Sequence, residues 1–250
     1  MNLTEYYLAK CFDKQGHREA FINGSLFLHS TAYYWTLENT FQQDFEGMIF
    51  HQTGKGYLIA ADSEFKKLFQ QAESLSDIVE NMEEHGKILS ETTEASFYVN
   101  GYLSCFYLLP KNDVHIENGT FEFTMPEAKR DLLYFFQKYL EGHEHVFPVL
   151  CDARRLCNCI MSHFEENRYD IAWGSVEYKE LELSERLTAY RNRKIEKIVF
   201  TKPLSYQYQR EFRIFICPKS MPVIDPFVES GVDIASSVVG TVDYFNDADI

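Results

Sequence analysis

The chain has 250 residues, of which 45% are hydrophobic and 25% are charged, a composition typical of a globular protein. Its formal net charge is −14, from 38 acidic and 24 basic residues, and this acidity excludes a broad basic surface for duplex nucleic acid. No apolar stretch reaches the roughly 18 to 20 residues of a membrane span, and the start of the chain lacks the charged-then-apolar plan of a signal peptide. We therefore expect a cytoplasmic protein with no membrane association.

Apolar alternation and turn-forming residues divide the first part of the chain into short strands and helices. Gly24 is expected to end the first helix, and Thr53–Gly56 to form a turn between two strands. Strands are predicted at Tyr6–Cys11, Leu26–Thr31, Gly47–His51 and Tyr57–Ala61. Helices are predicted at Lys14–Asn23, Tyr33–Gln43, Glu64–Gln71 and Ser76–His85.

The rest of the chain is predicted to be rich in strands. Asn118-Gly119 is the strongest hairpin signal in the sequence, and Pro126 begins the clearest helix. Helices are predicted at Pro126–Glu141 and Asp152–Glu165. Strands are predicted at Ser96–Leu109 with a break at Asn100-Gly101, and at Val114–Glu117, Thr120–Thr124, Val146–Leu150, Ile171–Lys179, Lys194–Thr201, Gln209–Cys217 and Val223–Val228. No repeat or linker divides the chain, so we expect a single α+β domain over residues 1–250, with a mixed, mostly antiparallel sheet and flanking helices.

Six cysteines are scattered through the sequence, and we expect them to be reduced thiols. They are Cys11, Cys105, Cys151, Cys157, Cys159 and Cys217. Cys157 and Cys159 lie in a predicted helix, where residues two apart do not share a face. The sequence therefore predicts no metal site.

The run YQYQREFRIFI, from Tyr206 to Ile216, alternates like a strand whose successive side chains point to opposite faces. One predicted face is apolar and belongs to the core, and includes Phe212, Ile214 and Ile216. The other face consists of Gln207, Gln209, Glu211, Arg213 and Phe215. Two interpretations of this second face are open: a solvated surface on which Glu211 pairs with Arg213, or the wall of a functional site.

The triplet Gln209-Arg210-Glu211 resembles the signature of the ADP-ribosyltransferase superfamily. In that family a glutamate on a late strand binds the ribose of NAD and stabilises the oxocarbenium-like transition state as nicotinamide leaves. The resemblance implies that Glu211 is the catalytic carboxylate, because a fixed negative charge stabilises a developing sugar cation. It also implies that Gln209 positions the acceptor and that the fold is ADP-ribosyltransferase-like.

The N-terminal region is similar to the same superfamily. Ser30-Thr31 follows the second predicted strand, where such enzymes often have Ser-Thr-Ser, so the resemblance implies that these residues shape the nicotinamide side. It implies that Tyr33 or Tyr34 stacks on the nicotinamide ring. The superfamily usually holds the dinucleotide with a basic residue of the first strand, a position where this chain offers only Lys10, unless His29 takes that role.

The chain is also similar to an uncharacterised family of bacterial and phage proteins. Those proteins end in a similar Tyr-x-x-Gln-x-Glu-Phe-Arg segment, which matches Tyr206 to Arg213 here. Together the resemblances imply an NAD-dependent ADP-ribosyltransferase, with NAD as substrate, that acts as a toxin or phage-conflict effector on a protein or nucleic-acid acceptor. They also imply an antitoxin or inhibitor partner.

An alternative function follows from the charge alone. A net charge of −14 is consistent with a well-solvated acidic surface, and also with a non-enzymatic acidic interaction protein that inhibits a host or phage nucleic-acid enzyme. A relative of the transferase fold with a decayed site is a third hypothesis. One spatial relation distinguishes them: the enzyme hypothesis expects Glu211 and Ser30 on neighbouring strands across one cleft.

Overall fold

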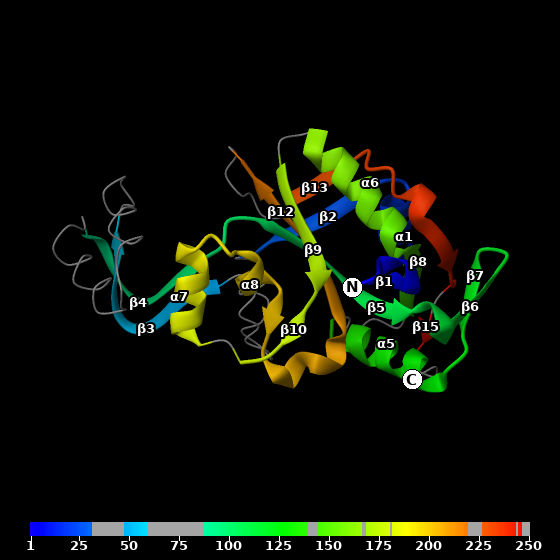
Figure 1. Ribbon diagram of the computed structural model, residues 1–250, viewed down its shortest axis with the longest axis horizontal. Coiled ribbons are helices and arrows are strands. Elements are labelled where there is room, and N and C mark those ends of the chain that lie inside the picture. Colours follow the sequence, from blue (N-terminus) through cyan, green and yellow to red (C-terminus); the bar gives the residue numbers. More distant parts are fainter. Residues whose placement is uncertain are drawn as a thin grey trace.

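A mostly antiparallel sheet of eleven strands forms the centre of the described part of the protein (Figure 1). The computed structural model describes residues 1–31, 48–59, 88–139, 145–166, 169–180, 182–219, 227–243 and 245–246. Helices and strands are mixed along the chain, so the predicted α+β class is confirmed. None of the helices in these residues is long and apolar enough to cross a membrane.

Strand β5 (Tyr102–Pro110) organises the sheet because it pairs along both of its edges. One edge pairs first with β2 (Ser25–Ser30) and then with β1 (Tyr6–Phe12), while the other pairs with β12 (Glu211–Pro218). All three pairings are antiparallel. β12 pairs in turn with β9 (Tyr169–Ser175), which is the last strand on that side among the described residues.

The sheet continues on the other side through β8 (His145–Asp152), which pairs with β1. Its remaining strands are β6 (Val114–Glu117), β7 (Thr120–Phe123), β13 (Phe227–Ser230), β14 (Val238–Thr241) and β15 (Phe245–Asn246). Two strand pairs lie outside it: the antiparallel pair β3 (Met48–Ile59) and β4 (Ile88–Tyr98), and the parallel pair β10 (Glu177–Tyr178) and β11 (Thr201–Lys202). Short 3-10 helices are η1 (Leu3–Glu5), η3 (Lys111–Asp113), η4 (Leu204–Gln209) and η5 (Ala235–Ser237).

One face of the sheet is covered by α6 (Ala153–Glu166) and α1 (Gln15–Ile22). Their apolar side chains pack against Leu8, Phe106 and Phe212, which are completely buried. Burial of each large apolar side chain stabilises the fold by about 1.5 to 3 kcal/mol. This face holds the largest apolar cluster, and the predicted core face of the late strand belongs to it.

The opposite face is covered by a single helix and by a pair of helices, each with its own apolar cluster. α5 (Pro126–Tyr139) packs against a cluster that includes Tyr107. α7 (Leu183–Arg191) and α8 (Glu196–Val199) pack against a second cluster that includes Leu103. The polar side chains of β12 are those of Glu211 and Arg213, which pair with Tyr107 and Cys105 and point to this face. They therefore lie between the two apolar clusters.

Predictions that rest on local signals are confirmed. Asn118 and Gly119 join β6 to β7 with positive φ angles of 51° and 77°, as a tight two-residue hairpin turn requires. Helix α5 begins at Pro126, and the break at Asn100-Gly101 separates β4 from β5. A Cβ atom on Gly101 would lie 2.3 Å from the ring of Phe215, so this break requires glycine.

Several predicted elements differ in the structure. β3 is continuous through Thr53–Gly56, so the predicted turn is wrong, and the register with β4 shifts there instead because glycines accommodate a bulge. The predicted strand Lys194–Thr201 contains helix α8, which buries Ile198 and Val199 against the sheet. The predicted helices Tyr33–Gln43, Glu64–Gln71 and Ser76–His85, and most of the predicted strand Val223–Val228, lie outside the described residues.

The predicted strand Ile171–Lys179 is divided into β9 and β10. The N–H of Val176 bonds to the carbonyl of Glu211, whereas the N–H of Glu177 bonds to the carbonyl of Phe200. The chain therefore leaves its partner β12 at this point and begins the short parallel ladder with β11.

Candidate functional site

The segment that carries Gln209 and Glu211 is a short helix followed by a strand. Helix η4 begins after Pro203 and ends at Gln209, and β12 begins at Glu211. Between them Arg210 has a left-handed backbone, with φ 41° and ψ 44°. The predicted strand over residues 206–216 is therefore wrong before Glu211, and Gln209 and Glu211 do not share a strand face.

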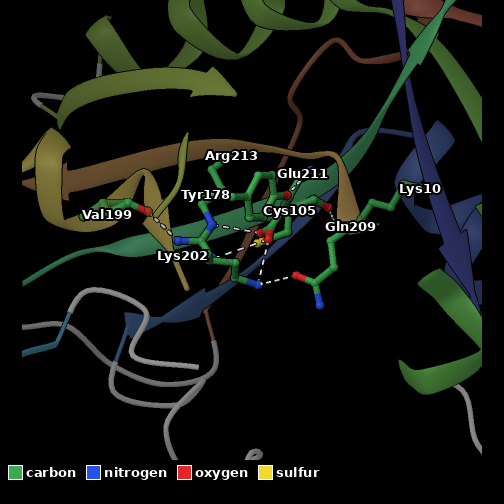
Figure 2. Close-up of polar contacts among 8 residues, drawn as sticks. All are labelled: Lys10, Cys105, Tyr178, Val199, Lys202, Gln209, Glu211 and Arg213. Carbon is green, nitrogen blue, oxygen red and sulfur yellow. Dashed lines mark hydrogen bonds and ion pairs between the residues drawn. The ribbon is translucent and has the colours of Figure 1, made fainter. Parts of the chain in front are cut away.

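Glu211 is the centre of a buried ion network (Figure 2). Its Oε1 accepts a hydrogen bond from Arg213 Nε at 2.8 Å, and its Oε2 lies 2.8 Å from Lys202 Nζ. The same Nζ donates to Gln209 Oε1 at 2.7 Å. Glu211 and Gln209 are each 1% exposed, while Lys202 and Arg213 are completely buried. One ammonium group thus holds Gln209 beside Glu211, although the two residues belong to different elements.

Neutral groups complete the network. The hydroxyl of Tyr178 accepts the N–H of Glu211 at 2.7 Å, and the thiol of Cys105 is hydrogen-bonded to the Glu211 carboxylate. Arg213 donates a further hydrogen bond to the carbonyl of Val199. These contacts come from four different parts of the chain, so the network ties β12 to β5, β10 and α8.

The charges in the network determine the protonation of Glu211. Burial by itself raises the pKa of this carboxyl, but the Arg213 guanidinium and the Lys202 ammonium outweigh burial and hold the pKa well below its usual value. Burial also raises the pKa of Tyr178, so its hydroxyl stays protonated at neutral pH. Two cations therefore flank a carboxylate that stays ionised at neutral pH. Removing one partner of such a buried group typically costs about 3 to 5 kcal/mol.

The polar face of β12 is therefore not a solvated surface. The Glu211–Arg213 pair that was one of the two interpretations does form, but inside the protein. Both carboxylate oxygens of Glu211 already have charged partners. In this arrangement the carboxylate is buried and is held by charged groups of the protein itself.

Ser30 and Glu211 are not brought together. Ser30 pairs with Tyr102 at one end of β5, whereas Glu211 pairs with Tyr107 near the other end and on the opposite edge. The five-residue offset corresponds to about 17 Å, because a strand rises about 3.4 Å per residue. The expected arrangement on neighbouring strands across one cleft is therefore wrong. Ser30 and Thr31 are each 2% exposed, and the Thr31 hydroxyl donates to a backbone carbonyl.

The other residues suggested for the dinucleotide are also dispersed. Lys10 lies on the α6 face of the sheet, opposite to Glu211, and its Nζ donates to Ser104 Oγ and to the Cys105 carbonyl, both at 3.2 Å. Burial lowers the pKa of Lys10. The ring of His29 stacks edge-on against Phe27, with 4.7 Å between centroids. Tyr33 and Tyr34 lie outside the described residues.

A hollow of about 550 Å³ lies on the far side of the β10–β11 ladder from the ion network. Tyr178 and Lys202 face the network, and their ladder neighbours Glu177 and Thr201 line the hollow. The hollow follows the outer edge of β9 and includes Trp173, whose side chain is 38% exposed. Its other lining residues are Ile171, Ala172, Ser175, Glu196, Lys197 and Phe200. We name it the edge groove. Its signal in the sequence is limited to a tryptophan on a predicted strand.

A second hollow, of about 310 Å³, lies beside α7 and α8. It is lined by Lys179, Ser184, Glu185, Thr188, Ala189, Asn192, Lys194 and Lys197. We name it the lysine hollow. Lys179, Lys194 and Lys197 come from predicted strands, and Ser184 to Asn192 come from a segment for which no element was predicted, so their convergence was not foreseen.

No cluster of three or more histidine, cysteine, aspartate or glutamate residues suited to a metal ion occurs in the described part of the chain. None of the six cysteines, all of which lie in the described residues, forms a disulfide bond. Comparisons with protein-family models, with curated proteins and with solved structures find no match to this chain.

Proposed function

We propose that this protein is a non-enzymatic acidic interaction protein that binds an extended, basic segment of a partner, such as a nucleic-acid enzyme of a host or phage. The observation that carries the proposal is the edge groove. It combines the outer edge of β9, an exposed Trp173 and two carboxylates, those of Glu177 and Glu196, against one ammonium group, that of Lys197. Within the described residues, β9 pairs only with β12.

The groove supports binding by strand addition. An extended segment that pairs with a sheet edge gains main-chain hydrogen bonds, while alternate side chains enter pockets. Trp173 and Phe200 offer surfaces for apolar or cationic side chains, and a cation over a tryptophan ring is typically worth about 0.5 to 2 kcal/mol. The net charge of −14 speeds the approach of a basic partner.

A labelled peptide of alternating lysine and leucine residues tests the proposal by fluorescence anisotropy. We expect wild type to bind it and Trp173→Ala to bind at least tenfold more weakly, with new hydrogen-exchange protection along Tyr169–Ser175. Phe27→Ala is the matched control, because Phe27 is an exposed aromatic residue (40%) on the distant strand β2. Equal losses in both variants, or equal binding of an acidic peptide, would contradict a specific groove.

A second candidate function is the NAD-dependent ADP-ribosyltransferase, acting in the cytoplasm as a toxin or phage-conflict effector, with an ADP-ribosyltransferase-like fold. One observation favours it: Gln209 and Glu211, which the resemblance names as the site, both contact Lys202 Nζ. The proposal requires the network to open so that Glu211 reaches the ribose. Mass spectrometry of lysate incubated with labelled NAD tests it, with Glu211→Gln as the inactive control at a temperature where a melting curve shows that this variant is folded. Transfer by wild type and not by this variant would support the enzyme and overturn the non-enzymatic proposal.

A further inference from the structure

The lysine hollow is a basic site on an acidic protein. Residues 179–197 contain six basic and four acidic residues, whereas the whole chain carries a net charge of −14. Three lysines of this segment, Lys179, Lys194 and Lys197, line one hollow of about 310 Å³. That volume is at the lower end of the range of small-molecule sites.

Helix α7 contributes hydrogen-bonding groups to the same hollow. Ser184, Thr188 and Asn192 are spaced four residues apart, so they share one face of the helix and its C-terminal cap. All three are exposed. Two hydroxyl groups and one amide therefore lie in a row beside the lysines.

The turn after α7 places Lys194 at the hollow. The N–H of Arg193 bonds to the carbonyl of Tyr190 at 3.0 Å, and the N–H of Lys194 bonds to the carbonyl of Ala189 at 2.8 Å. This pair of backbone hydrogen bonds is the Schellman motif, which ends a helix and usually has glycine at its left-handed position. Here Arg193 occupies that position with φ 55°. The turn is fixed by backbone bonds, so the position of Lys194 does not depend on a flexible loop.

The positive charge of the hollow is only partly neutralised. Lys179 pairs with Glu177 at 2.9 Å, but no carboxylate in the described part of the chain pairs with Lys194 or Lys197. The hollow contains one carboxylate, that of Glu185, which accepts the N–H of Glu182 at 3.0 Å in the capping box of α7. The site therefore offers ammonium and hydroxyl donors in excess of its negative charge.

We propose that the lysine hollow binds a small phosphate-bearing ligand, either free phosphate or the phosphate group of a nucleotide. Ammonium groups bind phosphate oxygens as point charges, and hydroxyl and amide groups supply directional hydrogen bonds. The lysine hollow adjoins the edge groove, because Lys197 lines both, but Lys194 and Thr188 line the hollow and not the groove. Substitutions at these two residues therefore test the phosphate proposal without changing the lining of the groove.

Isothermal titration of wild type with inorganic phosphate, pyrophosphate and ADP at low ionic strength tests the proposal, with the ligand that binds most tightly indicating the source of the phosphate. We expect saturable binding that weakens with added salt, a loss of at least tenfold for Lys194→Glu, and a smaller loss for Thr188→Val. Lys14→Glu is the matched control, because Lys14 is exposed on a distant element and makes no side-chain capping bond.

Melting curves establish that each variant is folded, and Lys194→Gln replaces Lys194→Glu if the latter does not fold. Absence of saturable binding to all three ligands at millimolar concentration would overturn the proposal. It would also be overturned if Lys14→Glu and Lys194→Glu weakened binding equally, since that result would indicate only the long-range effect of net charge.

Discussion

The ion network around Glu211 and the lysine hollow use similar charged groups in opposite ways. In the network, Lys202 and Arg213 are completely buried and share one carboxylate. In the hollow, Lys194 and Lys197 are exposed and lack a carboxylate partner among the described residues. Buried charges must be neutralised within the fold, because an isolated charge in the interior is costly. Exposed charges carry no such requirement and remain available to a ligand. The comparison predicts that mutations in the network change stability and that mutations in the hollow change binding.

Glu211→Gln tests the buried side of this comparison and has the largest expected effect. The amide keeps the shape of the side chain but leaves Lys202 and Arg213 without their carboxylate, so we expect a loss of about 3 to 5 kcal/mol in the free energy of unfolding. Urea unfolding at neutral pH measures it. Glu196→Gln is the control, since Glu196 is exposed and its replacement should cost less than about 0.5 kcal/mol. Equal stability of the two variants would place Glu211 outside the group of residues that stabilise the fold.

The pH dependence of stability tests the same charges without a change of sequence. The folded-state pKa of Glu211 is lowered below the unfolded value of about 4.3, so its contribution is complete above that value and is lost as the pH falls toward the folded pKa. Thermal melts of wild type between about pH 6 and pH 2.5 should therefore show a steeper loss of stability than melts of Glu211→Gln. Parallel curves would contradict the lowered pKa.

Gln209→Leu sharpens the comparison by removing a neutral partner of a buried cation. Lys202 Nζ loses the acceptor at 2.7 Å but keeps Glu211, so we expect a smaller loss, about 1 to 3 kcal/mol. Chemical unfolding measures this value, and Gln207→Leu is the control because Gln207 is exposed on the same helix. A loss as large as that of Glu211→Gln would mean that the amide and the carboxylate act as one unit.

Lys194→Glu has the smallest expected effect on stability. Its side chain is exposed and its backbone bond to Ala189 is retained, so the free energy of unfolding should change by less than about 0.5 kcal/mol. The same urea unfolding measurement checks it. A loss comparable to that of Gln209→Leu would show that the lysine hollow contributes to the fold, and the contrast between the two regions would fail.

Sequence signals predicted the fold where the cause of the structure is local. Asn118-Gly119 specifies its hairpin because both residues accept positive φ, and Pro126 specifies the start of α5 because its missing N–H is not needed there. The segment before Glu211 was predicted wrongly because its cause is a contact between Lys202 and Gln209, seven residues apart. Polar and apolar residues alternate there as in a strand, and this pattern contains no information about which polar groups are buried together.

The candidate site was predicted only in part for the same reason. The resemblance named Gln209 and Glu211 as a pair, and the structure does hold the two side chains together, but through Lys202 and not through a shared strand face. Ser30 was assigned to the same site by its place in a resemblance, whereas the strand order separates it from Glu211. The register of a strand in a sheet depends on its partners, and no pattern within Leu26–Thr31 specifies them.

The outer edge of β9 has a consequence for how copies of this protein behave toward one another. An unpaired strand edge is a template for another strand, including the same strand of a second molecule. Like charge opposes such self-association, because each copy carries a net charge of −14. The Debye length, beyond which this repulsion is largely screened, falls from about 10 Å at 0.1 M salt to about 3 Å at 1 M. Because β9 pairs only with β12 among the described residues, added salt is expected to shift the balance from separate molecules toward edge-to-edge dimers at a given protein concentration.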